Sequence, residues 1–172
     1  MRNTYSYDDV LLEPQYSTIR SRSEIDISSD LGKGVKIQLP IIAAPMDTVT
    51  EVAMGIAMTS YGATSILHRY NTIQEQMLMA QRVKAYNPTA LVGGAIGVRG
   101  DYLLRARALY EIGVDFICVD VAHGHHVLVR DALAALRQSF GPTIHLMAGN
   151  VATLQGTNDL ADWGADSVRV GI

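Results

Sequence analysis

The stretch IGVDFICVD, residues 112–120, joins a glycine to an apolar run that ends in an aspartate. A glycine in this position is typical of the end of a helix, and the run after it is typical of a strand buried on both faces of a parallel sheet. The same pattern occurs in YGATSILH, residues 61–68, and in WGADSVRVG, residues 163–171. The glycines Gly62, Gly113 and Gly164 follow one another at intervals of 51 residues, which indicates a regularly repeated structural unit.

Short apolar strands and helical patterns alternate on both sides of this stretch. We predict strands over residues 39–44, 63–68, 90–96, 114–121, 143–149 and 165–171. Thr50, Thr72 and Asp101 are predicted to cap the helices that follow them, and Glu75 completes a capping box with Thr72. Strands that alternate with helices in this way predict an α/β fold with a parallel sheet and crossover helices, in six β/α units.

The composition indicates one globular domain with a small-molecule partner. Apolar residues make up 48% of the 172 residues and charged residues 18%, so we predict a single domain over residues 1–172, with an irregular arm over residues 1–38. The formal charge of −3 is spread along the chain, which argues against a nucleic-acid partner. Since there is one cysteine, no signal peptide and no apolar run of membrane-spanning length, we expect a cytoplasmic protein without membrane contact.

Two architectures are built from such units, an open doubly wound sheet and the (β/α)8 barrel. An open sheet of six strands would be complete in 172 residues, whereas a barrel of eight strands takes roughly 250 residues. No dinucleotide-binding turn of the G-x-G-x-x-G kind follows the first strand, which argues against a Rossmann domain. Both architectures bind ligands at the carboxyl ends of their strands, so the residues at these ends are the site candidates.

The strand-end candidates are Met46, Asp47, Thr48, His68, Arg69, Arg99, Asp120, His123 and Asn150, with Arg169 inside the last strand. Asp120 is predicted to contact a ligand, because a carboxylate after an apolar run is costly without a partner, or else to cap the next helix. Asn150 suits a sugar hydroxyl or the cap of the following helix, and Arg169 suits a phosphate or a surface acid. His68 suits a ligand contact or a buried imidazole, and Met46 can pack against a flat ring.

The cysteine and the loop histidines have simpler interpretations. Cys118 shares its face of the strand with Asp120 but lies one layer deeper, which favours core packing over a role as nucleophile. His123, His125 and His126 in AHGHH suggest a metal site, yet the one nearby carboxylate is Asp120. Loop histidines with local hydrogen bonds are therefore the favoured interpretation, and we predict no metal site.

Seven stretches appear in an order that resembles the IMP dehydrogenase / GMP reductase family: YSYDDVLLEP, SRSEIDIS, PIIAAPMDTVTE, VGGAIGV, DVAHGH, AGNVAT and GADSVRVGI. Each stretch alone is a weak signal, and together they cover essentially the whole chain. The resemblance implies a (β/α)8 TIM barrel, incomplete here with about six of its eight β/α units. It also implies a purine nucleoside monophosphate as substrate, NAD or NADP as cofactor, and a homotetramer when the barrel is complete.

The resemblance also assigns site residues. It implies cofactor contacts for Ser21, Arg22, Arg69, Asp120, Val121 and Ala122, and purine-nucleotide contacts for Met46, Asn150 and Arg169. In the family, the strand that ends in VGI leads into a Gly-rich loop that carries the nucleophilic cysteine and a potassium (K+) site, and we expect this loop just after Ile172. The resemblance therefore implies no catalytic residue within these 172 residues, which alone are expected to be inactive.

The motifs are divided between dehydrogenase and reductase. Dehydrogenases of this family usually carry regulatory CBS modules between the equivalents of His68 and Ala90, where this chain has room for about one helix. PMDTVTE, VGGAIGV, HGH and AGNVAT favour the dehydrogenase, which converts IMP to XMP in guanine nucleotide biosynthesis, whereas SRSEIDIS and DVA favour the reductase, which converts GMP to IMP. We favour the dehydrogenase and keep two alternatives: the reductase, and a non-catalytic half-barrel that needs a separately encoded remainder.

Overall fold

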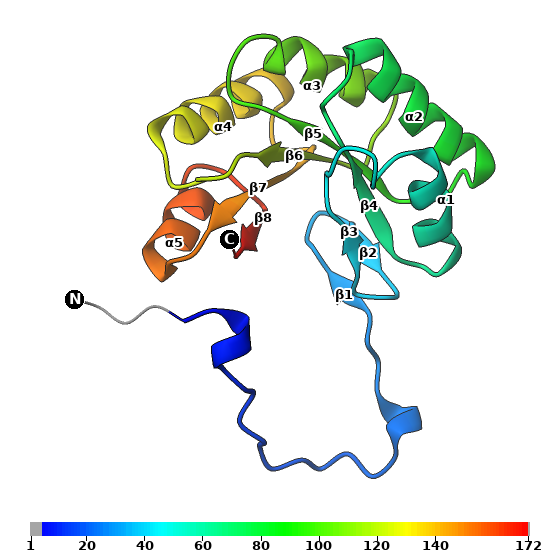
Figure 1. The fold of residues 1–172 in the computed structure, drawn as a ribbon, viewed down its shortest axis with the longest axis vertical. Helices are drawn as coiled ribbons and strands as arrows, with labels where there is room; N and C mark the ends of the chain where they lie inside the picture. The colour runs from blue at the N-terminus through cyan, green and yellow to red at the C-terminus, as the bar shows by residue number, and fades with distance from the viewer. Residues whose placement is uncertain (1–4, 172) are drawn as a thin grey trace.

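Six parallel strands form the main sheet, and their order in the sheet is their order in the chain (Figure 1). The computed structural model describes residues 5–171. The strands of this sheet are β3 (Ile42–Ala43), β4 (Thr64–Leu67), β5 (Val92–Ile96), β6 (Phe116–Asp120), β7 (His145–Val151) and β8 (Ser167–Val170). The helices between them are α1 (Val52–Ser60), α2 (Ile73–Tyr86), α3 (Tyr102–Glu111), α4 (Val127–Phe140) and α5 (Leu154–Asp162).

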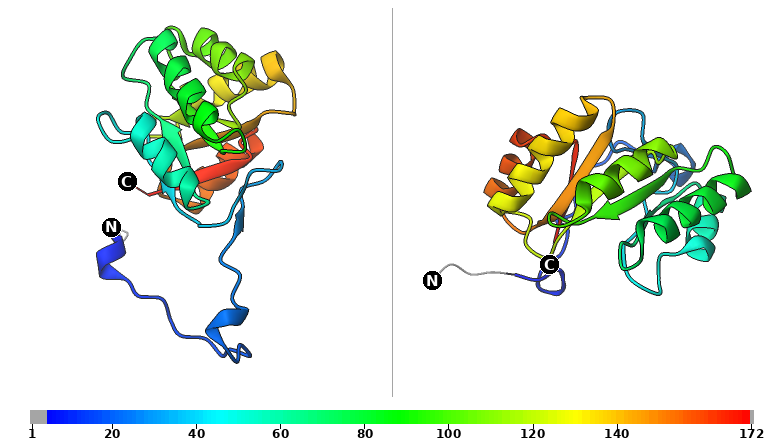
Figure 2. Two further views of the ribbon diagram at one scale, coloured as in Figure 1. Left: turned by 90° about the vertical axis from the view of Figure 1, so that its right-hand side faces the viewer. Right: turned by 90° about the horizontal axis from the view of Figure 1, so that it is seen from above.

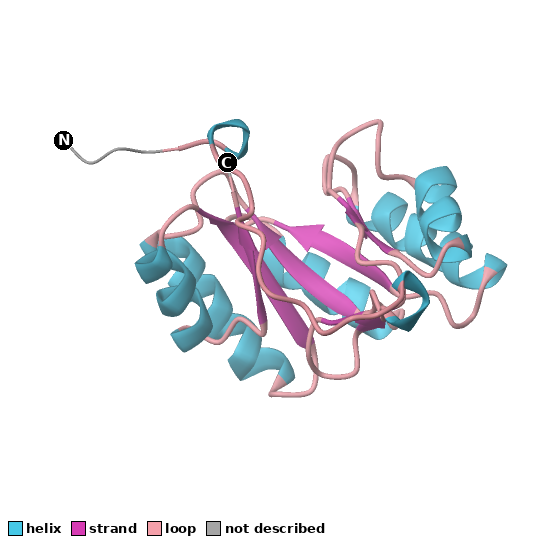
Figure 3. Cartoon of the chain, turned by 90° about the horizontal axis from the view of Figure 1, so that it is seen from below, coloured by secondary structure: helices cyan, strands magenta, loops and turns pink. Residues whose placement is uncertain are grey.

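The strand order decides between the two architectures. A doubly wound sheet reverses its strand order at a switch point and carries helices on both faces. Here each strand pairs in parallel with the next one along the chain, and α1 to α5 all lie on the outer face of a curled sheet (Figures 1 and 3). The sheet is a half-barrel of the α/β class, which confirms the predicted incomplete TIM barrel and excludes the open sheet.

Local sequence signals explain where the helices begin and end. Thr72 Oγ1 accepts a hydrogen bond from the Glu75 amide at 3.2 Å, and the Glu75 carboxylate accepts one from the Thr72 amide at 2.8 Å, so the predicted capping box is confirmed. The repeated glycines Gly62, Gly113 and Gly164 have φ values of +72°, +77° and +107°, which glycine adopts without strain at the end of a helix. Among the described residues, none of the helices is long and apolar enough to cross a membrane.

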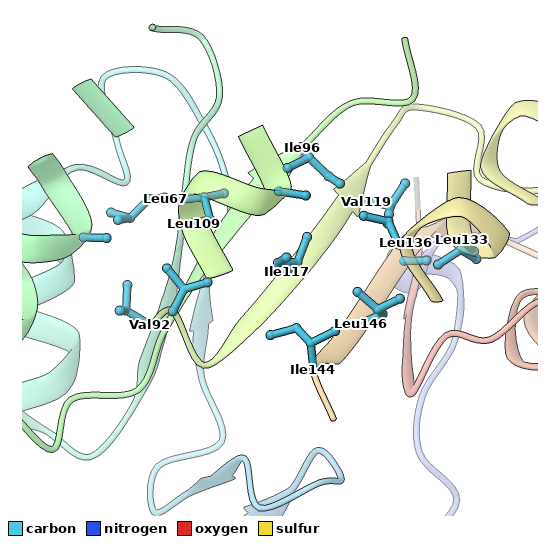
Figure 4. Close-up of a cluster of buried hydrophobic side chains, with 14 of the residues drawn as sticks. Leu67, Val92, Ile96, Leu109, Ile117, Val119, Leu133, Leu136, Ile144 and Leu146 are labelled. Carbon is cyan, nitrogen blue, oxygen red and sulfur yellow. The ribbon is translucent and has the colours of Figure 1, made fainter. Parts of the chain in front are cut away.

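Two apolar layers, one on each face of the sheet, hold the half-barrel together. Alternate residues of a strand point to opposite faces, so Ile117 and Val119 of β6 point outward, while Phe116 and Cys118 point inward. The outer layer fills the space between sheet and helices (Figure 4) and includes Leu67, Val92, Ile96, Leu109, Leu133, Leu136 and Leu146. The inner layer is made by strand residues together with Val35, which comes from the amino-terminal part of the chain.

Strand β5 carries two adjacent glycines because both of its faces are crowded at that level. A Cβ atom at Gly93 would lie 2.2 Å from the ring of Phe116 on the inner face. A Cβ atom at Gly94 would lie 2.7 Å from Leu109 of α3 on the outer face. The large side chains of the neighbouring elements therefore occupy the space that side chains of β5 would otherwise fill.

A hairpin closes the amino ends of the strands. Its strands, β1 (Ser29–Asp30) and β2 (Lys36–Ile37), are antiparallel. His145 of β7 is buried and donates from Nδ1 to the Gly32 carbonyl at 3.2 Å, so its Nε2 accepts from the Ser167 hydroxyl at 2.8 Å. Lys33 of the hairpin forms an ion pair with Asp166 at 2.8 Å. The hairpin is therefore fixed to the ends of β7 and β8.

The amino-terminal arm before this hairpin runs away from the sheet (Figures 1 and 2). It contains two short 3-10 helices, η1 (Tyr7–Asp9) and η2 (Arg22–Glu24). Its apolar side chains are exposed, with Leu11 and Leu12 each 97% accessible. The irregular arm predicted over residues 1–38 therefore consists of an extended segment, within the described residues, followed by the hairpin.

Two local predictions were wrong, and a third was right in its position but not in its hydrogen bond. Strand β7 runs on to Val151, so Asn150 lies inside the strand and not after it, beside an irregularity in the pairing with β8. The hydroxyl of Thr50 donates to a backbone carbonyl of the preceding loop instead of capping α1, whose N-cap is Glu51. Asp101 stands at the N-cap of α3, but its carboxylate accepts from Arg105 at 3.2 Å and makes no cap hydrogen bond.

Candidate ligand-binding site

A pocket of about 540 Å³ opens at the carboxyl ends of the strands. Its volume falls in the range of roughly 300–1,000 Å³ that is typical of small-molecule sites. The pocket is lined by Ala44, Pro45, Met46, Asp47, Arg69, Tyr70, Asp120, Val121, Ala122, Asn150 and Arg169. Seven of the nine residues that the family resemblance assigns are therefore brought together here, although they come from five different strands or strand-end loops.

An ion pair stands in the inner wall of the pocket. Asp120 at the end of β6 and Arg169 in β8 are both in register with Gly149 of β7, so their side chains meet across that glycine. Arg169 Nη1 donates to Asp120 Oδ1 at 2.5 Å. A Cβ atom at Gly149 would lie 2.7 Å from the Arg169 Cβ, which leaves room for glycine alone. The pair presents one guanidinium and one carboxylate to anything bound in the pocket.

Cys118 lies one layer below this ion pair. Its side chain is completely buried, and Arg169 Nη1 approaches its sulfur to 3.9 Å. Burial raises the pKa of the Cys118 thiol to about 12, so the sulfur is a neutral thiol at physiological pH. Burial also opposes the charge of Arg169, but the neighbouring Cys118 and Asp120 together raise the pKa of this guanidinium. Cys118 therefore packs in the inner core and supplies no thiolate nucleophile.

Two buried polar atoms of the pocket have no hydrogen-bond partner among the described residues: Arg69 Nε and Asn150 Oδ1. The guanidinium of Arg69 lies 5.3 Å from the ring centre of Tyr70, and its Nη2 donates to the Asp120 carbonyl at 3.4 Å. A buried polar atom without a partner costs about 1–3 kcal/mol. One donor and one acceptor are thus held ready in the wall of the pocket, which is what a polar ligand requires.

The loop between β3 and α1 forms the opposite wall and carries Met46 and Asp47. Next to it, His68 Nε2 lies 3.8 Å from Asp47 Oδ1 and 3.5 Å from Glu51 Oε1. These three side chains have the separations of a metal-ligand set. However, His68 Nδ1 accepts a hydrogen bond from the Tyr70 amide at 3.2 Å, so the proton of the ring is on Nε2. This arrangement suits a donor to carboxylates and opposes metal coordination through Nε2.

The three histidines of the loop after β6 have three different surroundings. His126 caps α4, since its Nδ1 accepts from the Leu128 amide at 3.1 Å. His125 Nε2 lies 2.6 Å from Asp159 Oδ2 of α5. His123 is exposed and has its ring 6.5 Å from that of His126. Local hydrogen bonds therefore explain the positions of His125 and His126. Within residues 5–171, the three histidines do not form part of a group of side chains spaced to bind a metal ion.

The structure also excludes the helix-cap interpretations of two site residues. The N-cap of α4 is His126, not Asp120. The N-cap of α5 is Thr153, whose hydroxyl accepts from the Gly156 amide at 3.0 Å, so Asn150 does not cap that helix. Arg169 pairs with an inward-facing acid and not with a surface acid.

Six sequence-predicted residues do not line the pocket: Ser21, Arg22, Thr48, His68, Arg99 and His123. Ser21 caps η2 by accepting from the Ser23 amide, and Arg22 is exposed in the same arm, so their cofactor role stays a prediction. Arg99 and Thr48 are exposed and do not line the pocket. Sequence reasoning missed Tyr70, which follows Arg69 at the end of β4 and would have been found by extending the strand-end search by one residue.

The fold and the pocket define a (β/α)-barrel protein with a ligand site at the carboxyl ends of its strands, the position at which barrel enzymes carry their active sites. The family model of the IMP dehydrogenase / GMP reductase domain matches residues 4–172. The chain therefore belongs to the IMP dehydrogenase / GMP reductase family, as its motifs predicted.

The chain is similar both to inosine-5'-monophosphate dehydrogenases and to GMP reductases. It is 26% identical to an inosine-5'-monophosphate dehydrogenase from Nitrosopumilus maritimus, over 97% of the chain and 60% of that relative. It is 32% identical to a GMP reductase from Albidiferax ferrireducens, over 98% of the chain and 50% of that relative. It is 30% identical to an inosine-5'-monophosphate dehydrogenase from Cryptosporidium parvum, over 97% of the chain and 51% of that relative. The chain thus spans about half the length of the curated relatives it matches.

Proposed function

We propose that the chain forms the nucleotide-binding part of a purine-nucleotide oxidoreductase that uses NAD or NADP, with IMP dehydrogenase favoured over GMP reductase. The observation that carries this proposal is the pocket in which seven family-assigned residues meet at the strand ends. The family match supports the reaction class and leaves its direction open. The favoured direction is supported by the sequence motifs around Met46 and Asn150.

The chemistry of the pocket fits a nicotinamide nucleotide on one side. Asp120, Val121 and Ala122 would hold it, because the Asp120 carboxylate suits ribose hydroxyl donors and the next two residues line the same pocket. When bound, the nicotinamide cofactor would supply hydride transfer to or from the purine nucleotide. Arg69, whose Nε has no hydrogen-bond partner within residues 5–171, would donate to a phosphate or a ribose oxygen of the same ligand.

A purine nucleoside monophosphate fits the other side. Met46, on the β3–α1 loop, is 56% exposed and presents a polarizable side chain that packs well against a flat ring. Asn150 Oδ1 offers an acceptor for a ribose hydroxyl or a ring N–H. Arg169, held by Asp120, would orient the nucleotide by a charge-assisted hydrogen bond. These residues bind and orient, and none of them is a nucleophile.

Two alternatives remain, and the binding chemistry supports both. A GMP reductase would use the same two halves of the pocket, but the hydride would pass from the cofactor to the purine nucleotide. A non-catalytic half-barrel would bind nucleotide but act only together with a separately encoded remainder. We also propose that residues 1–172 form one catalytic-barrel domain without a CBS insertion. This is supported by the reductase alignment, which extends over 170 residues, against 289 residues for the dehydrogenase from Nitrosopumilus maritimus.

Binding and turnover together test the proposal. The 172-residue chain is titrated by calorimetry with IMP, GMP, NAD and NADP, and we expect saturable binding of one purine nucleotide and one dinucleotide. Asp120→Ala should weaken dinucleotide binding at least about tenfold, because it removes the hydroxyl acceptor and leaves Arg169 without its partner. Asp131→Ala, an exposed acid of α4 outside the pocket, is the matched control and should bind as the wild type does.

Turnover separates the alternatives. The chain is assayed alone and mixed with a fragment that carries the last two β/α units of a relative, by following NAD(P)H absorbance. Formation of NADH from IMP in the mixture supports a dehydrogenase, and consumption of NADPH with GMP supports a reductase. Turnover in the mixture, but not by the chain alone, supports a half-barrel that acts together with a separately encoded remainder. Absence of any nucleotide binding would contradict the proposal, and turnover by the chain alone would contradict the prediction that its nucleophile is missing.

A further inference from the structure

The loop that joins β6 to α4, residues 121–126, is hydrogen-bonded on its inner side to the end of β7. The Gly124 amide donates to the Asn150 carbonyl at 2.7 Å, and the Val121 amide donates to the Gly149 carbonyl at 3.0 Å. A Cβ atom at Gly124 would lie 2.9 Å from the Asn150 carbonyl oxygen, so the loop lies directly on the backbone of β7. This contact fixes the depth at which Val121 and Ala122 stand in the pocket wall.

The outer side of the same loop is held by a different pair of residues. His125 Nε2 donates to Asp159 Oδ2 at 2.6 Å, because a carboxylate can only accept and the proton must therefore be on Nε2. The imidazole ring also lies on Trp163, with ring centres 5.7 Å apart and planes inclined by 33°. His125 and Asp159 are each about two-thirds buried, at 32% and 31% side-chain exposure. A short, partly buried hydrogen bond to a carboxylate is among the stronger contacts that a loop can make.

We propose that His125 and Asp159 form an outer clamp that keeps the 121–126 loop in the position from which it contacts the dinucleotide, so that His125 is a positioning residue of this site. The consequence for binding rests on the proposed function. The clamp connects the loop to α5, which packs on β7 and β8. Release of the outer contact should loosen the hydrogen bond from the Gly124 amide to the Asn150 carbonyl, so that Ala122 can leave the wall of the pocket.

The three loop histidines offer a matched set of variants. His125→Phe keeps an aromatic ring against Trp163 but removes the donor to Asp159. His125→Gln places an amide N–H near the position of Nε2 and should restore the contact. His123→Phe makes the same chemical change at an exposed histidine for which no hydrogen bond is seen within the described residues. Asp159→Leu removes the acceptor from the other side.

The first readout needs no ligand. Amide hydrogen exchange at Gly124, measured by NMR on the 172-residue chain, should become at least about tenfold faster in His125→Phe and Asp159→Leu. The double variant should exchange no faster than either single variant, since both remove one contact. His123→Phe and His125→Gln should stay close to the wild type. Unchanged exchange at Gly124 in His125→Phe would overturn the clamp.

The second readout is the affinity for NAD and NADP, compared with that for IMP and GMP. His125→Phe should raise the dissociation constant of the dinucleotide about tenfold and leave that of the mononucleotide unchanged, and His125→Gln should restore the wild-type value. Equal losses for both ligands, or no loss for the dinucleotide, would overturn the positioning role. If the wild-type chain binds no dinucleotide at all, the proposed function fails, while the exchange data still decide whether the clamp exists.

Discussion

At the amino ends of the strands, His145 has both ring nitrogens hydrogen-bonded, and the hairpin covers the opening of the half-barrel. At the carboxyl ends of the same strands, Arg69 Nε and Asn150 Oδ1 have no partner among the described residues, and a pocket of about 540 Å³ is open. Satisfied polar groups stabilise a fold, whereas unsatisfied ones cost stability and are retained where a ligand completes them. The inner face of one sheet therefore holds the fold together at one end and carries the candidate binding pocket at the other.

The largest effect on stability is expected from a substitution at the amino ends of the strands. Phe116 is completely buried in the inner layer, 6.0 Å from His145 between ring centres. Phe116→Ala should lower the free energy of unfolding by about 3–5 kcal/mol, because it removes a buried ring and leaves a cavity against Gly93. Urea denaturation measures the loss. Leu104→Ala, on an exposed part of α3, is the control and should change the value by less than about 0.5 kcal/mol.

A smaller effect at the same end should depend on pH. Burial lowers the pKa of His145 below its ordinary 6.5, so the unfolded chain takes up a proton before the folded one does. The free energy of unfolding should therefore fall as the pH drops below about 6.5, with a slope of at most about 1.4 kcal/mol per pH unit. Denaturation curves at pH 7.5, 6.5 and 5.5, roughly spanning the ordinary histidine range, measure it.

The pH effect has its own control. His145→Gln removes the titrating group, so the slope between these pH values should disappear. A slope that persists in this variant would assign the acid sensitivity to another group. Asp166 is not that group, because burial favours its neutral form but hydrogen bonds from Lys33, the Leu146 amide and Arg137 keep its pKa below 3.8, and its contribution is lost only in stronger acid.

The smallest effect on stability is expected at the carboxyl end. Asn150→Ala removes a side chain whose Oδ1 makes no hydrogen bond to the part of the chain that the structure describes, so the free energy of unfolding should change by no more than about 0.5 kcal/mol. The affinity for IMP should fall about tenfold, because the acceptor offered to the ligand is gone. Calorimetry measures both quantities on one protein. A large loss of stability without a loss of affinity would reverse the proposed division between the two ends.

The sequence contained most of the fold because its signals are local. The glycines Gly62, Gly113 and Gly164 need φ values that other residues avoid, and the Thr72 capping box is complete within four residues. These features predicted the alternating elements before any long-range contact was known. Local signals could not distinguish an open sheet from a barrel, since both are built from the same β/α units. The resemblance of the seven motifs to the family predicted the barrel correctly.

The parts that could not be predicted depend on contacts between distant segments. Thr50 resembles a helix cap in the sequence, but the preceding loop folds back and offers its hydroxyl a carbonyl. Asn150 was placed after its strand because nothing local shows that β7 continues to Val151. Asp159 lies in the middle of a helix and outside every sequence motif. Its contact with His125 could not be predicted, because it depends on how α5 packs beside the loop.

The tight fit of Gly93 against Phe116 has a consequence for how this sequence can change over generations. A side chain at position 93 has no space while the phenyl ring remains, and a small residue at position 116 leaves a void while position 93 lacks a side chain. Neither position can be substituted alone without a clash or a cavity. A paired substitution, with a larger residue at position 93 and a smaller one at position 116, conserves the total side-chain volume. Related chains should therefore vary at these two positions together, with a larger residue at one accompanied by a smaller residue at the other.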